Sequence, residues 1–171
     1  MSDAARPLPA NAFWTFSARV YARSGVTDAC LKLQDDFGLD VNLLLFCLWS
    51  AAEGPGRLDA ADVDRLTELV GQWQSETVQP LRAIRRQPRE ALGDELARFF
   101  RATMLQAELD AERVEQELLF RWAGEHPRNP ETDVAAEAAR NLIVYLAREG
   151  IATEQVAPQL RTLLAAVAEP D

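Results

Sequence analysis

Residues 41–52 read VNLLLFCLWSAA, and this stretch decides the fold of the chain. Its apolar side chains surround the helical axis instead of following one face. A helix that is apolar all round has to be covered by other helices, so it belongs in the middle of a domain. Asp40 directly precedes the stretch, where a carboxylate accepts hydrogen bonds from the free backbone N–H groups of a first turn. The sequence therefore predicts a central buried helix over about residues 41–52.

On either side of this stretch, apolar residues recur at helical spacing, without alternating β-branched runs or Asn-Gly and Asp-Gly turns. Asn11 is expected to cap a first helix, and Gly38 to end a second one in a left-handed conformation. Asp59 is expected to cap a helix that ends before Pro80. A short basic helix, LRAIRR, follows and is expected to stop before Pro88.

The longest helical pattern runs from about residue 89 to residue 123, with a bend or break near Gly93. One apolar stripe along it is expected to be buried: Leu96, Phe99, Thr103, Ala107, Ala111, Val114, Leu118 and Trp122. The segment GEHPRNP, residues 124–130, is typical of a turn-rich linker. Two more helices are expected after it, the last one capped by Thr153.

These patterns predict a single compact all-α domain of seven or eight helices around the central helix. The chain has 171 residues, a length that suits one domain. Residues 1–10 are expected to form an irregular leader and residues 11–123 the main helical domain. Residues 131–168 are expected to supply two C-terminal helices that pack on it.

The chain is acidic, with 18 basic against 27 acidic residues and a net charge of −9. Nucleic-acid binding depends on clustered positive charge, so this balance argues against it. The longest unbroken apolar run has seven residues, Leu43 to Trp49, against the roughly 20 that cross a bilayer. The first residues lack the pattern of a signal peptide. We therefore expect a cytoplasmic protein without a membrane role.

The charges are unevenly distributed along the chain. Residues 79–101 hold six arginines against three acids, a balance of +3, whereas residues 102–120 hold five acids against one arginine, a balance of −4. The basic segment contains Arg82, Arg85, Arg86 and Arg89. Arginine forks bind carboxylates and phosphates through two hydrogen bonds. These four residues therefore form a partner-binding or anion-binding site, an RNA contact, or an internal salt-bridge network.

The residues needed for the common catalytic sites are missing. His126 is the only histidine, and Cys30 and Cys47 both lie in apolar helical patterns that favour reduced core cysteines. No glycine loop has the spacing of a phosphate-binding motif. We expect no metal, no cofactor and no catalytic residue, and the chain as a whole looks less like an enzyme than a binding protein.

The stretch from Tyr21 to Ala51, YARSGVTDACLKLQDDFGLDVNLLLFCLWSA, resembles a proteobacterial family of conserved proteins of unknown function. That family has about 160 residues, a length close to that of this chain, and the signature GVxxACLxLQDxxGxDVNxLLFxxW. The matching residues are Tyr21, Gly25, Val26, Ala29, Cys30, Leu31, Leu33, Gln34, Asp35, Gly38, Asp40, Val41, Asn42, Leu44, Leu45, Phe46 and Trp49. The resemblance implies a cytoplasmic bacterial protein and supplies no activity.

Packing alone does not account for the polar residues of this signature. We expect Gln34, Asp35, Asp40 and Asn42 to form a polar cluster at the corner around Gly38, either as a structural feature or as a ligand site. Asp35, Asp36 and Asp40 are also similar in type to the acids that bind Mg²⁺ and diphosphate in all-α isoprenoid synthases. However, Gly38 is expected to interrupt the helix between them.

Two functions follow from these observations. The first is an accessory or interaction protein that docks to another macromolecule, most simply a protein, through residues 82–89 and a face of the long helix. The alternative is a small Mg²⁺-dependent or diphosphate-binding enzyme or ligand-binding protein that uses Asp35, Asp36 and Asp40. It predicts an open polar cavity beside Gly38. The sequence leaves the oligomeric state and the identity of the partner open.

Overall fold

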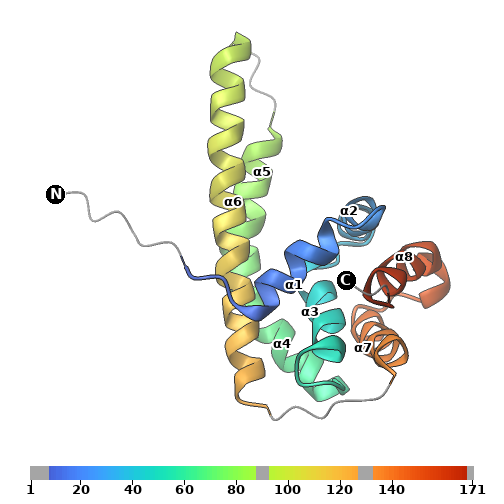
Figure 1. Cartoon of the computed structure of the whole chain (residues 1–171). Coiled ribbons are helices and arrows are strands. Elements are labelled where there is room, and N and C mark those ends of the chain that lie inside the picture. Colours follow the sequence, from blue (N-terminus) through green and yellow to red (C-terminus); the bar gives the residue numbers. More distant parts are fainter. Residues whose placement is uncertain (1–7, 88–92, 127–132, 169–171) are drawn as a thin grey trace.

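A computed structural model describes residues 8–87, 93–126 and 133–168, and every regular element in these ranges is a helix. The α-helices are α1 (Ala12–Tyr21), α2 (Val26–Phe37), α3 (Val41–Ala52), α4 (Ala60–Trp73), α5 (Gln79–Arg86), α6 (Gly93–Gly124), α7 (Val134–Arg148) and α8 (Ala157–Ala168). A π-helical segment, Gln74–Val78, connects α4 to α5, and a 3-10 turn, Thr153–Val156, leads into α8. The predicted all-α single domain is confirmed (Figure 1).

The central helix is α3, as predicted. Every residue from Asn42 to Ala51 is buried, and α3 packs against α1, α2, α6, α7 and α8. Phe46 and Trp49 make ring contacts with Phe13 of α1 at centroid distances of 5.3 Å. The helix therefore forms the centre of the core, which its apolar residues on all sides require.

The expected helix ends are largely confirmed. The Asn11 side chain accepts a hydrogen bond from the Trp14 N–H at 2.7 Å, and Asp40 accepts from Asn42 N–H at 2.8 Å. Asp59 forms a capping box with Asp62. Gly38 has a φ of +71°, which is the left-handed conformation that glycine adopts most readily.

The expected break before Pro80 is absent, because the chain is helical without interruption from Ala60 to Arg86. Pro80 lies at the start of α5 directly after the π turn, whose wider hydrogen-bond spacing leaves room for the proline ring. The wider π turn before it is held by two contacts with α6. Trp73 Nε1 donates to the Ala111 carbonyl at 2.9 Å, and Gln74 donates to Glu115 at 2.7 Å.

Helix α6 is unbroken over its 32 residues and begins at Gly93, whose φ of +67° agrees with the expected break there. Its expected apolar stripe is only partly buried, since Leu96 and Phe99 are 61% and 73% exposed. The buried positions are Ala97, Glu108, Ala111, Glu115, Gln116, Leu119 and Ala123. Three of these residues are polar, and other helical segments supply their hydrogen-bond partners.

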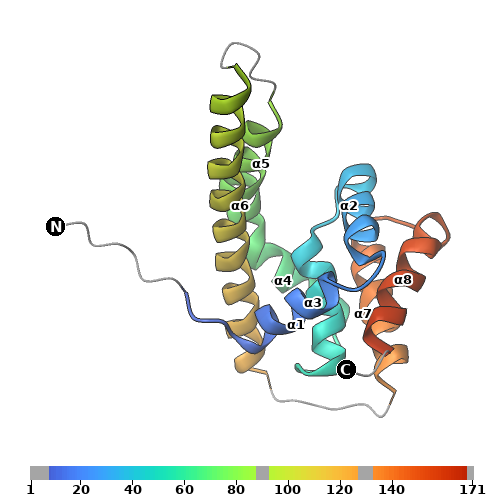
Figure 2. The same cartoon turned by 45° about the horizontal axis from the view of Figure 1, so that its top comes forward.

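Helices α5 and α6 lie side by side and extend together beyond the other helices (Figures 1 and 2). The predicted leader, residues 1–10, and the predicted linker, residues 124–130, lie in part outside the described residues, which omit residues 1–7 and 127–132. Within the described ranges, no helix is both long enough and apolar enough to span a bilayer.

Candidate functional site

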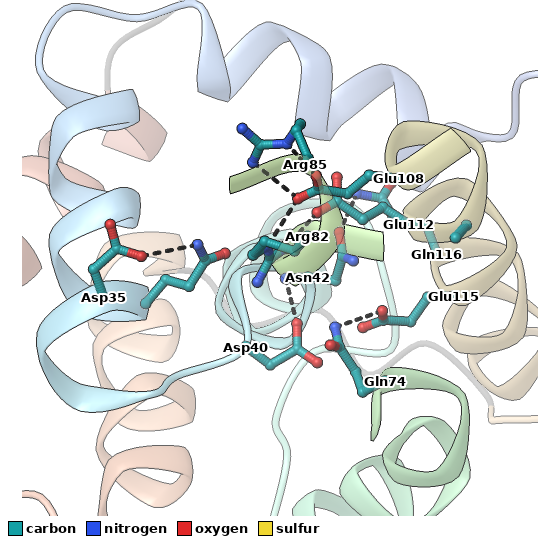
Figure 3. Close-up of polar contacts among 12 residues, drawn as sticks. Asp35, Asp40, Asn42, Gln74, Arg82, Arg85, Glu108, Glu112, Glu115 and Gln116 are labelled. Atoms are coloured by element: carbon teal, nitrogen blue, oxygen red, sulfur yellow. Dashed lines mark hydrogen bonds and ion pairs between the residues drawn. The ribbon is translucent and has the colours of Figure 1, made fainter. Parts of the chain in front are cut away.

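The structure brings the arginines of α5 and the polar corner around Gly38 into one site. Arg86 Nη2 donates to Asp35 Oδ1 at 2.9 Å, a contact between residues 51 positions apart in the sequence. Arg82 lies between the corner and α6, and its hydrogen bonds reach α6 (Figure 3). Helix α5 therefore connects the two polar groups that the sequence predicted separately. Arg89, the fourth expected arginine, lies outside the described residues.

Arg82 and Arg85 form an ion-pair network with two glutamates of α6. Arg82 Nε and Arg85 Nε donate to the two carboxylate oxygens of Glu108 at 2.8 Å and 2.5 Å, and Arg82 Nη2 donates to Glu112 at 2.7 Å. The side chain of Glu108 is 5% exposed and that of Arg82 is 16% exposed. Two of the four expected arginines therefore have their counterions inside the fold.

The pKa values of the two glutamates shift in opposite directions. Burial alone would raise the pKa of Glu108, but hydrogen bonds from Arg85 and Arg82 outweigh it and hold this pKa below its usual value. Burial raises the pKa of Glu112, and its ion pair with Arg82 compensates only in part. Glu108 is thus the carboxylate that the arginines stabilise in its charged form.

The polar corner separates into an outer and an inner pair. Gln34 donates to Asp35 at 3.3 Å, and hydrogen bonds from Arg86 and Gln34 lower the pKa of exposed Asp35. Asp40 and Asn42 instead face inward. Asp40 caps α3, and Asn42 Oδ1 accepts from Gln116 Nε2 of α6 at 2.8 Å.

Asp36 is not part of the corner site. Its carboxylate lies 3.2 Å from Lys32 Nζ on an exposed face of α2. Among the residues that the structure describes, no group of three or more His, Cys, Asp or Glu side chains is arranged to hold a metal ion.

The sequence did not reveal that Asp40 forms a buried acid pair with Glu115. Burial and the nearby charge of Asp40 raise the pKa of Glu115 to about 11, so it is protonated at neutral pH and donates a hydrogen bond to Asp40. Burial also raises the pKa of Asp40. Glu108, Glu112 and Glu115 have the spacing i, i+4, i+7, which places them on one helical face. That spacing, next to an arginine-rich segment, was a signal for an inward-facing acidic stripe.

Two neighbouring cavities adjoin these residues. The first, which we call the corner cavity, has a volume of about 370 Å³ and lies beside Gly38, with Asp35, Asp40, Arg82 and Arg86 in its wall. The second, which we call the apolar groove, has a volume of about 290 Å³. Residues of both walls are Gln34, Val41, Asn42, Arg82 and Glu112. The network of Arg82 therefore borders both cavities.

The apolar groove is formed by helices α1, α2, α3, α5 and α6. Its apolar lining consists of Trp14, Ala18, Tyr21, Leu31, Val41, Leu45, Leu105 and Leu109. Leu31, Leu105 and Leu109 are 41%, 44% and 41% exposed. Sequence reasoning missed this groove because its leucines come from α2 and α6, which are far apart in the chain.

Cys30 and Cys47 are both free and buried, as predicted, and burial raises the pKa of each thiol to about 12. A thiol with such a pKa stays protonated and is a poor nucleophile. Neither cysteine lines the corner cavity or the apolar groove.

A family model described as "Protein of unknown function (DUF2390)" matches residues 12–119. The matched region starts at the first residue of α1 and ends within the last turns of α6, so it includes the network, the corner and the apolar groove. The corner cavity is also lined by Tyr145 and Glu149, which lie beyond the matched region. No curated protein and no solved structure matches the chain.

Proposed function

The chain belongs to the DUF2390 family of proteins of unknown function, and from the geometry of its site we propose that it is an accessory protein that docks to another protein through the apolar groove. The wall of this groove combines the two surfaces that the sequence favoured. Arg82 and Arg85 come from the arginine segment, and Leu105 and Leu109 come from a face of the long helix.

The observation that supports docking is the gathering of exposed leucines at one groove. Leu31, Leu105 and Leu109 are each exposed by about two fifths, yet they line one cavity together. Single exposed leucines are common on protein surfaces, whereas apolar side chains grouped around a hollow are typical of interaction sites. Covering these three side chains would remove apolar area from water, which is the main favourable term in protein association.

We propose that the occupant is an amphipathic helix of the partner with basic residues beside its apolar face. Helices bind grooves between other helices through apolar side chains spaced three and four residues apart. The charged residues of the groove wall form ion pairs with one another, and the chain as a whole has a net charge of −9. Basic side chains flanking the apolar face of the partner would complement this charge and speed association.

In this proposal the arginines shape the groove. Arg82 and Arg85 hold α5 against α6 through Glu108 and Glu112, and Arg86 holds α5 against α2 through Asp35. These ion pairs fix the helices whose side chains form the wall. Their charges are largely neutralised inside the chain, so the contact energy comes from the leucines.

Co-purification with groove variants tests the proposal. The tagged chain is expressed at its native level as wild type, as Leu109→Glu and as Leu69→Glu. Leu69 is 40% exposed on α4 and lies outside both cavities, so it is a matched control. Leu109→Glu should lose a protein that wild type and Leu69→Glu retain, while all three keep the same melting temperature. Equal recovery of that protein with Leu109→Glu would overturn the proposal.

A second candidate function is favoured by the corner cavity. The diphosphate-binding alternative requires an open polar cavity beside Gly38, and a cavity of about 370 Å³ lies there. Arg82 and Arg86 lie in its wall, and a diphosphate that binds them would have to replace Glu112 and Asp35 as their partners. This function uses Asp35 and Asp40 but not Asp36, whose side chain points to Lys32.

Thermal stability in the presence of Mg²⁺ and inorganic diphosphate tests this candidate. Binding raises the melting temperature of the folded chain by mass action. The shift should occur with wild type and shrink with Arg86→Ala, whose side chain is half exposed. Without a shift in wild type, or with an equal shift in Arg86→Ala, the candidate fails.

We further propose that the protein acts in the bacterial cytoplasm, as the resemblance of residues 21–51 implies. The partner in this proposal is a protein and not a nucleic acid or a membrane, since the net charge of −9 opposes phosphate-rich surfaces.

A further inference from the structure

The outer face of α6 holds most of the large apolar side chains that the described part of the chain exposes. Four of these seven side chains lie on α6, namely Leu96, Phe99, Leu105 and Leu109. Phe99 is 73% exposed, more than any of the others. Helix α6 extends with α5 beyond the other helices, so this face is open to another molecule (Figures 1 and 2). Exposed apolar side chains gathered on one surface are typical of an interaction site.

Exposed residues of this face have the spacing of a coiled-coil seam. Phe99, Ala102, Gln106 and Leu109 are separated by three, four and three positions, and all four are exposed. Spacings that alternate between three and four place side chains along one line of a helix, where a second helix can pack. Gln106 is the polar member of this seam, and its amide donates to Asp110 of the same helix at 3.1 Å.

The seam is complementary to itself when two copies of the helix run antiparallel. In such a symmetric pair, with the two-fold axis midway between Ala102 and Gln106, position 99 of one copy faces position 109 of the other. Phe99 then packs on Leu109 of the second copy, and the small side chain of Ala102 leaves room for Gln106. Leu105 lies on one flank of the seam and faces Leu105 of the second copy near the axis.

The charged residues beside the seam favour the same register. Arg98 is exposed on the flank that carries Leu105, and in the antiparallel pair it approaches Glu112 of the second copy. The side chain of Glu112 is 25% exposed and is paired with Arg82 of its own chain. Burial nevertheless raises the pKa of Glu112, so a second cation beside it would stabilise its charged form. A parallel pair would lose this contact.

We propose that the outer face of α6 binds the same face of a second copy, so that the chain forms a reversible antiparallel dimer. The seam covers about three helical turns on each copy. This is less than a permanent dimer requires, so the dimer should form as the protein concentration rises. Each copy has a net charge of −9, which opposes association at long range. Burial of Phe99 and the leucines therefore supplies the favourable free energy.

The dimer would also control access to the apolar groove. Leu105 and Leu109 belong both to this face and to the wall of the groove. The second copy and the partner helix proposed above therefore exclude each other. Phe99 belongs to the face but does not line the groove. This competition rests on the docking proposal, whereas the dimer itself does not.

Sedimentation velocity of the full chain over a wide range of concentrations tests the dimer. Wild type should shift from the mass of one chain toward twice that mass. Phe99→Glu should need at least about tenfold more protein for the same shift, because each dimer loses two apolar contacts. Ile143→Glu is the matched control, since Ile143 is 49% exposed on α7. A wild type that stays monomeric, or a Phe99→Glu variant that dimerises like wild type, would overturn the inference.

Disulfide formation between two variants that each add one cysteine tests the antiparallel register. The native Cys30 and Cys47 are buried and should not interfere. Ala102→Cys and Gln106→Cys chains should become disulfide-linked when they are mixed and oxidised, because these positions face each other. Neither variant should do so alone, because two copies of either position lie about 6 Å apart along the helix axis, in addition to the distance between the helices. Linkage in either variant alone and none in the mixture would overturn the antiparallel register.

The outcome is separable from that of the docking proposal. If wild type stays monomeric while Leu109→Glu still loses the partner, the dimer is wrong and the docking stands. If wild type dimerises through this face while Leu109→Glu keeps the partner, the dimer stands and the docking proposal fails. If both hold, Phe99→Glu should recover at least as much of the partner as wild type does, because the groove is then free in every chain.

Discussion

At the scale of single residues, Arg82 and Arg86 lie one helical turn apart on α5 but have different surroundings. The side chain of Arg82 is 16% exposed and binds Glu108 and Glu112, whereas that of Arg86 is 47% exposed and binds Asp35, itself 46% exposed. The cost of removing one member of an ion pair depends on whether the remaining charge can be solvated. Arg82 is therefore expected to contribute more to the stability of the fold than Arg86.

Arg82→Ala should lower the free energy of unfolding by about 2–4 kcal/mol, because it leaves Glu112 without its ion pair and Glu108 with Arg85 alone in a partly buried site. Arg86→Ala should cost less than about 1 kcal/mol, since water replaces its exposed ion pair. Urea unfolding followed by circular dichroism measures both. Equal losses would contradict the view that the network lies inside the fold.

Glu115 makes the stability of the chain depend on pH. Its pKa of about 11 in the fold compares with an ordinary value of 4.5, so between these values the folded chain holds a proton that the unfolded chain has released. Stability from this group therefore rises as the pH falls from 8 to 5, by up to about 1.4 kcal/mol per pH unit.

Glu115→Gln should remove this slope and make the chain more stable than wild type at pH 8, because glutamine has the shape of the protonated acid without its charge. Asp110→Asn on the same helix changes the net charge equally at an exposed position and is the control. Thermal unfolding at several pH values measures the difference. Wild type and Glu115→Gln with parallel profiles would show that Glu115 is not the protonated member of the pair.

Most residues of the site could be predicted from the sequence, but the contacts that bring them together could not. The charges of residues 82–89 and the polar signature around Gly38 are visible as local patterns. Their contact through Arg86 and Asp35 joins positions 51 apart, and it depends on how α5 lies against α2. Gln116 carries no pattern at all, since its hydrogen bond to Asn42 joins positions 74 apart.

At the scale of helices, most ends are encoded locally and the π segment is not. Asn11, Asp40 and Asp59 cap their helices because a short side chain reaches the backbone N–H groups of its own first turn. The segment Gln74–Val78 depends on contacts of Trp73 and Gln74 with α6. The local sequence around Pro80 suggested a helix break because it does not show these contacts. Whether the helix can continue through this proline depends on the distant helix α6.

Deletion of Ser75 tests the role of this segment. The π turn holds one residue more than an α turn over the same rotation, so losing the exposed Ser75 should restore α geometry without rotating α5 relative to α4. Pro80 would then lie inside a regular α-helix, where its ring clashes with the carbonyl group four residues before it. We expect a lower melting temperature, with Ser75→Ala close to wild type. A deletion variant as stable as wild type would show that the π turn is not what accommodates Pro80.

At the scale of the whole molecule, one buried helix organises the core, and one long helix extends from it. Helix α3 contacts helices from both ends of the chain, while α6, about 48 Å long for its 32 residues, projects with α5 beyond the core (Figures 1 and 2). The central helix was predictable because no surface helix is apolar all round. The buried face of α6 was not, because buried Glu108, Glu115 and Gln116 resemble surface residues until their partners are known.

Hydrogen exchange should follow this arrangement. The amides of α3 should exchange only on global unfolding, and those at the start of α6, around exposed Leu96 and Phe99, should exchange fastest among the helices. Mass spectrometry of the exchanged chain resolves the two regions. Comparable protection in both would contradict a core centred on α3.

The central claim is that the apolar groove is where the protein meets its partner, and site-specific photocrosslinking in the cell tests it most directly. A photoreactive phenylalanine derivative is placed at position 31, 105 or 69. These three leucines are equally exposed, and only the first two line the groove. We predict that positions 31 and 105 both crosslink to one and the same protein and that position 69 does not. Crosslinking to that protein from position 69, or none from positions 31 and 105, would contradict the claim.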